Sequence, residues 1–434
     1  MMLSIADGVG RSQALVGLFE QLMGVYSVSD CETQLADAIE SFLRGLGYGG
    51  AGRSLTFRRL GDTVVASTNF GLPQRVILAG HIDTVPVIEN FPPVWLEPSD
   101  PRVREDVAAE SAGQRVMWGR GATDMKASDA VFLYIAYIAS LAARTSEASV
   151  RRPRYDLTFV FYDHEEVAAP KNGLRKVVQA HPDWVQGDFA IIGEPTSCGI
   201  EGGCNGTMRF DVVTHGVAAH SARAWMGHNA IHDAAEVLAR LERFVPTDVT
   251  VDGLVYREGL NATMISGGTG TNVIPDECRV HVNYRFAPDK TIGQAKVLMF
   301  GGRADDASTM PCLGRGEMVA AGGLFQGFGV EMKDESPAAR PGMDSPLAAS
   351  LARLVSEQTG LKPEAKLGWT DVARFSQLGV PAVNFGAGSP LLAHKADEQL
   401  PVSQLDVMAS ILLNWLCDVE VGSQAHEELR NNGN

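Results

Sequence analysis

Apolar residues recur along the chain with two different spacings, and each spacing predicts one kind of element. In residues 11–47 they fall at helical spacing, and the continuous apolar run 130–143 favours a buried helix. Short runs rich in β-branched and aromatic residues predict strands at 62–68, 75–80, 155–162 and 187–195. Because these strands alternate with helices, we expect an α/β domain with a mostly parallel sheet and helices on both faces.

The pattern changes near Gly206. From there the expected order is strand, helix, strand, strand, helix and strand, over residues 207–216, 229–244, 262–268, 278–286, 291–300 and 328–334. This β-α-β-β-α-β order describes a ferredoxin-like α+β sandwich. The first pattern returns with elements at 345–360, 381–388 and 403–419. We therefore predict a catalytic domain in two parts, 1–205 and 338–434, split by an inserted domain at 206–337. The Gly-rich stretch 301–328 is predicted to be a loop.

The bulk composition is that of a globular protein with two domains. The chain has 434 residues, of which 45% are hydrophobic and 21% charged, and its formal net charge is −15. That charge disfavours nucleic acid as a partner, because phosphate binding needs a basic surface. We predict no membrane span, because the run 130–143 is too short to cross a bilayer and the start of the chain lacks the features of a signal peptide.

The six cysteines are scattered, and none forms a C-x-x-C pair. In a chain of this length such cysteines are typical of reduced thiols in a cytoplasmic protein. They therefore predict neither a disulfide framework nor a thiolate zinc site.

Polar residues able to bind a metal or move a proton follow five of the apolar segments. They are His81 with Asp83, Asp124, Glu165 with Glu166, Glu194, and His394. Ligands gather outside the carboxyl ends of strands in an open parallel sheet, so we expect these side chains to share one edge. One histidine or carboxylate at such a place is usually structural, but several together repel one another unless a cation offsets them. The set predicts a metal centre, and zinc accepts these donors.

Two short motifs add detail to this edge. In His81-x-Asp83 the carboxylate is expected to lie on the same side of the strand as the imidazole and to accept its second N–H. The segment GRGATD, residues 119–124, resembles a phosphate loop but lacks the required order of glycines and lysine. We expect its glycines to form a tight turn that directs Asp124 inward.

The motifs GHIDTVP, GRGATDMK, HEE, GEPT and AHKADE occur in this order and resemble the co-catalytic di-zinc aminoacylase/carboxypeptidase family. The resemblance covers nearly the whole chain. It implies two Zn²⁺ ions, with Co²⁺ an alternative in vitro. By matching position, it implies that His81 and Glu194 bind one ion, that Glu166 and His394 bind the other, and that Asp124 bridges them. It makes Glu165 the general base and Asp83 the carboxylate that orients His81.

The segments GVAAHSARAWMGHNAI and GTGTNVIP of the inserted domain resemble the same family's lid. The resemblance implies that the lid forms a homodimer and that His220 reaches the partner subunit's site to stabilise the oxyanion. It also implies substrate contacts by further side chains, namely Arg223, Asn272, Arg285, Thr370 and Arg374.

Within the family, GWTDVARF and NYRFAP resemble segments that bind a small-molecule substrate with several carboxylates. The implied activity is removal of succinate from N-succinyl-L,L-2,6-diaminopimelate in lysine and diaminopimelate synthesis. Guanidinium groups at Arg285 and Arg374 suit such a substrate, because they bind carboxylates bidentately.

Two alternatives remain open. The chain could be another deacylase of the family, such as an acetylornithine deacetylase, an aminoacylase or a carboxypeptidase, whose zinc ligands would look the same in sequence. It could also be a non-catalytic, metal-stabilised binding protein, although such a protein has no need of the base Glu165. His164 stands where the family commonly has Asp. We expect His164 to lie outside the ligand set, and Asp163 to end a strand.

Overall fold

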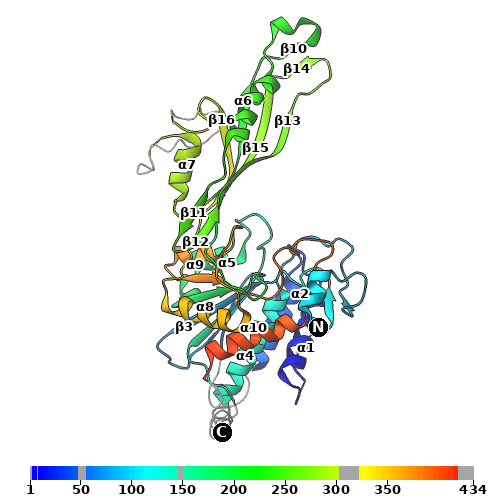
Figure 1. Cartoon of the computed structure of the whole chain (residues 1–434), viewed down its shortest axis with the longest axis vertical. Coiled ribbons are helices and arrows are strands. Elements are labelled where there is room, and N and C mark those ends of the chain that lie inside the picture. The colour runs from blue at the N-terminus through cyan, green and yellow to red at the C-terminus, as the bar shows by residue number, and fades with distance from the viewer. Residues whose placement is uncertain (1, 7, 47–54, 145–149, 303–321, 419–434) are drawn as a thin grey trace. The chain divides into compact units, whose positions relative to one another are not determined.

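The structure, a computed structural model, describes the chain except residues 1, 7, 47–54, 145–149, 303–321 and 419–434 (Figure 1). It divides into two compact units. Unit 1 comprises Met1–Gly202, Gly342–Glu364 and Arg374–Asn434, and unit 2 comprises Gly203–Pro341 and Ala365–Ala373.

Unit 2 contains the predicted insertion and also a segment, Ala365–Ala373, that the sequence pattern assigned to the second part of the catalytic domain. Hydrogen bonds explain why this segment belongs there. The side chain of Asn205 donates to the carbonyl of Leu367 at 3.1 Å, and the indole of Trp369 donates to the carbonyl of Pro337 at 3.1 Å. Such contacts join residues that are far apart in the sequence, so the sequence pattern does not reveal them.

The largest sheet has eight strands in the order β1-β2-β6-β3-β7-β18-β8-β17. Their bounds are β1 Leu55–Leu60, β2 Thr63–Thr68, β3 Arg75–His81, β6 Asp156–Tyr162, β7 Phe189–Ile192, β8 Glu201–Gly202, β17 Glu364–Ala365 and β18 Ala382–Asn384. The four strands β6, β3, β7 and β18 pair in parallel. The pairs β1–β2, β2–β6 and β18–β8 are antiparallel.

The sheet is therefore mixed, and the prediction of a mostly parallel sheet holds only for its centre. The reason lies in the connections. A two-residue turn, Gly61–Asp62, joins β1 to β2, and so short a link can only join antiparallel strands. The sequence pattern marked β2 as a strand but did not reveal its partners.

Five helices of unit 1 pack on one face of this sheet. They are α1 Arg11–Met23, α2 Thr33–Leu46, α4 Lys126–Arg144, α8 Pro346–Thr359 and α10 Ser403–Leu416. Every second residue of the central strands joins their core, as Leu157, Phe159 and Phe161 do on β6. The residues between them, such as Thr158 and Val160, are buried as well, so the strands are covered on both faces.

Helix α4 is longer than the apolar run that predicted it. With 19 residues and a mean hydropathy of 1.3 in its most apolar window, the helix could cross a membrane by length and composition, but 78% of that window is buried inside the unit. We read it as the central core helix of unit 1. Of the cysteines in the described ranges all five are free; Cys312 lies outside those ranges.

Unit 1 also contains a second, smaller sheet and several short helices. A three-stranded sheet has the order β19-β5-β4, with β4 Val94–Leu96, β5 Val116–Trp118 and β19 Gln399–Pro401. The short helices are α3 Glu105–Glu110, α5 Gly173–Ala180, η1 Pro182–Val185 and α9 Val372–Gln377. The pairing of β5 with β19 brings the segments around residues 124 and 398 together.

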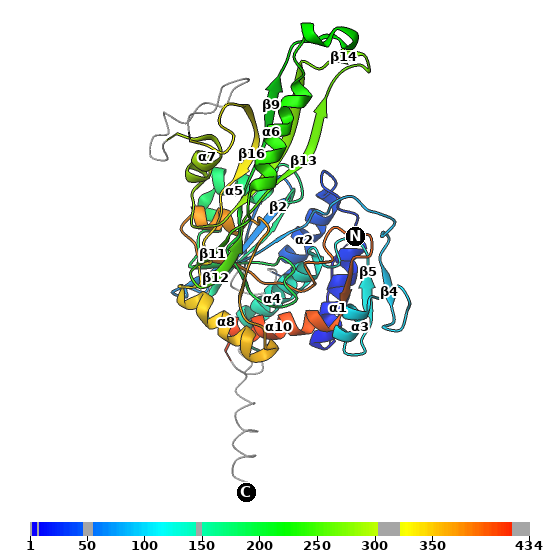
Figure 2. The same cartoon turned by 45° about the horizontal axis from the view of Figure 1, so that its top comes forward.

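Unit 2 is built on a four-stranded antiparallel sheet in the order β13-β15-β9-β16. Its main elements are β9 Gly206–His215, α6 Ala230–Arg243, β13 Gly259–Gly267, β15 Glu277–Phe286, α7 Ile292–Phe300 and β16 Gly329–Ser336. Their order along the chain is the predicted one. Both helices share one apolar core with the sheet, and α6 runs along β9 and β13 (Figure 2).

Two small ladders extend unit 2. β11 Asp248–Val251 pairs with β12 Leu254–Arg257, and β10 Ala219–His220 pairs with β14 Val273–Ile274. The 3-10 helix η2, Ser221–Met226, follows β10 directly. Of the predicted loop 301–328, residues 303–321 lie outside the described ranges.

Candidate active site

The register of the parallel strands brings three of the predicted segments to one edge of the sheet. His81, the last residue of β3, lies beside Tyr162, the last residue of β6. On the other side of β3, Ala79 lies beside Ile192, the last residue of β7. The segments that begin at Asp163 and Gly193 therefore leave the sheet next to His81, as expected for an open α/β sheet.

Asp124 lies between the two predicted histidines. Its Oδ1 is 3.0 Å from Nε2 of His81, and its Oδ2 is 3.3 Å from Nε2 of His394. Nε2 of His394 is also 3.0 Å from the carboxylate of Glu166. Residues separated by more than 200 positions thus meet at one carboxylate.

These contacts belong to three overlapping groups of residues. Within each group, the potential ligand atoms all lie within 4.8 Å of one another. The groups are His81 with Asp124 and Glu194, Asp124 with Glu166 and His394, and His81 with Glu165 and Glu166. Imidazole nitrogens and carboxylate oxygens are the donor set of protein zinc sites. Because Asp124 belongs to two groups, the residues present fit a pair of ions with one shared ligand.

The electrostatics of the site favour a cation. Hydrogen bonds to Asp124 and Glu166 raise the pKa of His394 to about 10. Burial alone would lower the pKa of His81, but the hydrogen bond and charge of Asp124 outweigh burial and raise it. Burial and the negative charge of Asp124 raise the pKa of Glu166. The negative charge of neighbouring carboxylates contributes to all three shifts, and a bound metal would offset that charge.

Asp83 is fully buried, but its contacts differ from the predicted ones. Nδ1 of His81 lies 3.0 Å from the backbone carbonyl of Asp83 and 3.6 Å from its carboxylate. The strand ends at His81, so the rule that residues i and i+2 face the same way does not extend to Asp83. The carboxylate instead accepts the backbone N–H groups of Glu165 at 2.9 Å and Glu166 at 3.1 Å, and the hydroxyl of Ser29 at 2.7 Å.

The chain turns at His164, between the end of β6 and the pair Glu165 and Glu166. The φ of His164 is 58°, in the left-handed region, where histidine is among the tolerated residues. The strand β6 has ended two residues earlier, and the chain bends so that both glutamates approach the ligand cluster. His164 itself belongs to none of the three ligand groups among the described residues.

Glu398 supports the site, although it is not among the residues predicted from the sequence. It is fully buried, and its Oε1 accepts the backbone N–H groups of Thr123 at 2.9 Å and Asp124 at 3.2 Å. Its Oε2 accepts a hydrogen bond from buried Arg120 at 2.7 Å. Burial and the charge of Asp124 raise the pKa of Glu398 to about 7. Its presence in the AHKADE motif was the one available signal.

Three of the predicted lid residues lie together at the β10–β14 ladder of unit 2. His220 pairs with Val273, and the backbone N–H of Ser221 donates to the carbonyl of Asn272 at 2.9 Å. Nδ1 of His220 accepts the N–H of Ala222 at 3.1 Å and caps η2. Arg223 is exposed within η2, where its backbone is not helical. His220 and Asn272 are also exposed.

The other predicted substrate residues are divided between the units. Arg285 on β15 and Thr370 belong to unit 2, and Arg374 on α9 belongs to unit 1. Thr370 and Arg374 are buried, with 3% and 6% of their surfaces exposed. Burial and the nearby charge of Arg209 lower the pKa of Arg285.

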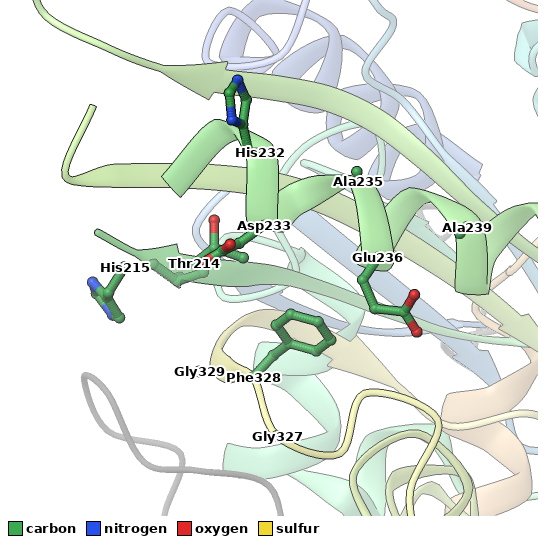
Figure 3. Close-up of a pocket in the computed structure, with 11 residues that line it drawn as sticks. Thr214, His215, His232, Asp233, Ala235, Glu236, Ala239, Gly327, Phe328 and Gly329 are labelled. Carbon is green, nitrogen blue, oxygen red and sulfur yellow. The ribbon is translucent and has the colours of Figure 1, made fainter. Parts of the chain in front are cut away.

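A pocket of about 780 Å³ lies in unit 2 between α6, β9 and the start of β16 (Figure 3). His232 and Glu236 of α6, His215 of β9 and Phe328 line it. None of the predicted site residues lines this pocket, and the described part of the chain offers no three-residue metal group there.

The profile of peptidase family M20/M25/M40 matches residues 77–418, and the chain belongs to this family. This confirms the family that the motifs predict. A Corynebacterium glutamicum protein named succinyl-diaminopimelate desuccinylase is 38% identical over 401 residues, covering 92% of this chain and 95% of the relative. A Mycobacterium tuberculosis protein named putative succinyl-diaminopimelate desuccinylase is 38% identical over 403 residues, covering 92% and 97%.

Solved structures with lower identity share the fold. A tripeptidase from Staphylococcus aureus superposes with a TM-score of 0.66 at 19% identity, over 94% of this chain and 98% of that one. A dinuclear metal-binding peptidase of family M20 from Bacillus subtilis gives a TM-score of 0.58 at 17% identity, over 93% and 97%. These likenesses establish the α/β architecture alone.

Proposed function

We propose that this chain is a two-zinc hydrolase that removes succinate from N-succinyl-L,L-2,6-diaminopimelate, a step of lysine and diaminopimelate synthesis. The observation that carries the reaction type is Asp124, whose two oxygens lie 3.0 Å from His81 and 3.3 Å from His394. A carboxylate shared by two ligand sets is typical of two-metal hydrolytic centres. The substrate rests on relatives of that name at 38% identity over 92% of the chain.

The ligand roles follow from the two groups that share Asp124. His81 and Glu194 would hold one ion, Glu166 and His394 the other, and Asp124 would bridge them. We propose zinc because the donors are imidazoles and carboxylates, a set that Co²⁺ also accepts in vitro. A bound pair of such ions supplies a water of lowered pKa and polarises the scissile carbonyl.

Glu165 would be the general base. Its carboxylate lies in one group with the imidazole of His81 and the carboxylate of Glu166, so it is within reach of a water at the same place. In this role it takes a proton from the attacking water and delivers that proton to the leaving amine nitrogen. Asp83 would help to position Glu165, because its carboxylate accepts a hydrogen bond from the backbone N–H of Glu165.

His220 and the substrate contacts belong to the same proposal. His220 would donate a hydrogen bond to the oxyanion of the tetrahedral intermediate, where charge develops in the transition state. The proposed substrate carries three carboxylates, and a chain of net charge −15 needs local cations to bind it. Arg285 and Arg374 would supply bidentate contacts, with Arg223, Asn272 and Thr370 as further polar contacts.

Unit 2 would serve as the lid and as the surface of a homodimer. β13 stands at the end of the sheet order, and every residue of β13 after Leu260 is exposed. Met264 and Ile265 on this strand are 65% and 54% exposed. An apolar edge strand of this kind is a ready template for pairing with a second copy. We place the enzyme in the cytoplasm because its proposed pathway and its free thiols fit that compartment.

A substrate panel tests the proposal. The chain is stripped of metal with a chelator, reloaded with Zn²⁺, and assayed on N-succinyl-diaminopimelate, N-acetylornithine, N-acetyl amino acids and dipeptides. We expect hydrolysis of the succinylated substrate alone, and only after zinc is restored. A preference for N-acetylornithine or a dipeptide would assign the chain to another activity of the family. Absence of all turnover in the reloaded protein would favour a binding role.

A further inference from the structure

His164 is the residue of the HEE motif to which neither the metal site nor the proposed mechanism gives a role. It directly precedes Glu165 and takes the left-handed conformation that turns the chain after β6. Its side chain is largely buried, with 14% of its surface exposed. A histidine at such a turn needs an explanation, because glycine or asparagine would turn the chain without a large side chain.

Three carboxylates from two distant parts of the chain surround the imidazole. Nδ1 of His164 lies 2.6 Å from Asp163 and 3.3 Å from Glu32, and Nε2 lies 3.0 Å from Asp30. Glu32 is 1% exposed, and the carboxylate of Asp30 also accepts a hydrogen bond from Lys171 at 2.6 Å. Both imidazole nitrogens therefore face carboxylate acceptors, and the imidazole lies between residues 30–32 and residue 163.

The segment that carries Asp30 and Glu32 is attached to the active site independently. The backbone N–H of Thr84 donates to the carbonyl of Ser27 at 2.9 Å, and that of Ser29 donates to the carbonyl of Thr84 at 3.1 Å. The hydroxyl of Ser29 donates to the carboxylate of Asp83 at 2.7 Å. Asp83 in turn accepts the N–H groups of Glu165 and Glu166.

Together these contacts form a closed loop of interactions around the segment 163–166, which we call the ring. From Asp83 these contacts pass through Ser29 to Asp30, across His164, and back to Asp83 through the N–H of Glu165. Asp83 fixes the backbone of the two glutamates, and the imidazole fixes the residue just before them. A side chain at position 164 without two opposed nitrogens would leave one part of the ring open.

We propose that His164 is a positioning residue that fastens the segment bearing Glu165 to residues 30–32 and so sets the direction of the Glu165 carboxylate. The inference rests on the proposed role of Glu165 as the base. It predicts that the imidazole affects the chemical step and neither metal binding nor substrate binding. A carboxylate at position 164 would fail in this role, because it would face Asp30, Glu32 and Asp163.

The test uses His164→Asn, since asparagine tolerates the left-handed backbone but is too short to reach Asp30 and Glu32 together. His232→Asn, at an exposed site on α6, is the matched control. We expect kcat for N-succinyl-diaminopimelate to fall about 10-fold or more in His164→Asn, with KM within about twofold and two metal ions per chain retained. His232→Asn should match the wild type.

A second variant separates positioning from general destabilisation. Asp30→Asn replaces the carboxylate that lies 3.0 Å from Nε2 of His164 and leaves the backbone at 164 unchanged. If both residues act through one ring, the double variant loses no more kcat than His164→Asn alone. Additive losses, loss of a metal ion, or a kcat within twofold of wild type would each overturn the proposal.

Hydrogen exchange provides a readout that does not depend on the substrate. The amides of Glu165 and Glu166 should exchange faster in His164→Asn than in wild type, while those of strand β3 stay unchanged. Unchanged exchange at both amides would overturn the positioning role. If exchange increases but the wild type hydrolyses no succinylated substrate, the ring is upheld and the proposed function is what fails.

Discussion

Oδ1 of Asp83 accepts the backbone N–H of Glu165 at 2.9 Å. This bond joins the end of β3 to the segment after β6, and a second bond joins the same carboxylate to Glu166 at 3.1 Å. One buried carboxylate therefore fixes the backbone of the proposed base and of a proposed metal ligand. Since Nδ1 of His81 contacts the carbonyl of Asp83, the same residue also orients a second ligand.

Asp83→Asn should weaken the metal site and lower activity without unfolding the protein. The amide retains one acceptor oxygen, but its NH₂ group would face an N–H donor, so one of the two backbone bonds is lost. Changes of this kind behind a metal site typically cost about 10- to 100-fold in metal affinity or activity. Zinc titration and steady-state kinetics measure both quantities. Ser29→Ala, which removes only one donor to Asp83, should show a smaller loss, and wild-type behaviour of Asp83→Asn would contradict this view.

Glu165→Gln should separate catalysis from metal binding. The amide cannot accept the proton of the water, so kcat should fall by roughly 10²- to 10⁴-fold. Metal content, measured by elemental analysis, should remain at two ions per chain. Glu357→Gln, at an exposed glutamate of α8, serves as the control and should leave kcat unchanged. Surviving activity in Glu165→Gln would show that another group moves the proton.

Removal of the metal ions should lower stability as well as activity. Without them the carboxylates of Asp124, Glu166 and Glu194 gather around the imidazoles of His81 and His394 with no metal charge to offset their repulsion. A ligand at about 1,000 times its Kd stabilises the folded state by about 4 kcal/mol, so the midpoint of thermal unfolding should rise steadily with added zinc. His394→Ala should bind one ion fewer than wild type. A thermal unfolding midpoint that does not change with added zinc would argue against the proposed metal site.

Glu398→Gln should destabilise unit 1. Oε2 of Glu398 accepts a hydrogen bond from Arg120, whose side chain is 2% exposed. The substitution leaves the guanidinium buried without its counter-charge, which costs about 3–5 kcal/mol for pairs of this kind. Denaturant unfolding measures the loss. The double variant Arg120→Met/Glu398→Gln removes the unpaired buried charge and should recover part of the stability. Equal stabilities of Glu398→Gln and wild type would show that the Arg120–Glu398 pair contributes little to the free energy of unfolding.

Asp211 should make the stability of unit 2 depend on acid pH. Burial alone would raise its pKa, but hydrogen bonds from His281 at 2.7 Å and Lys333 at 2.9 Å outweigh burial and lower it below 3.8. A lowered pKa in the folded state gives stability that is present above the unfolded pKa and is lost as pH falls through the folded pKa. Asp211→Asn should therefore melt lower than wild type near pH 6.

The same comparison at low pH provides the check. The difference in melting midpoint between wild type and Asp211→Asn should shrink as pH falls below about 3.8, the usual pKa of an aspartate. Glu242→Gln, on the same unit, shows no comparable set of partners in the described residues and serves as the control. A difference that stays constant down to pH 2 would mean that Asp211 contributes through packing rather than charge.

The sequence was most informative where a polar residue follows a buried strand. His81, Asp124, Glu165, Glu166, Glu194 and His394 could be chosen because strand ends in an α/β sheet converge, and their convergence appears in the three ligand groups. The need for a turn before Glu165 was also readable, since adjacent residues on a strand face opposite ways. Figure 3 shows a pocket that sequence periodicity gives no means of finding.

The sequence alone determined the family, the order of the elements and the residue types of the proposed metal centre, because periodicity and motif spacing are local properties. Only the tertiary structure decided which group each of the supporting carboxylates contacts. Asp83 meets Glu165 across 82 positions, Glu398 meets Thr123 across 275, and His164 meets Asp30 across 134. Such contacts depend on strand register and on where each strand ends, which are fixed by long-range packing and leave no periodic signal in the chain.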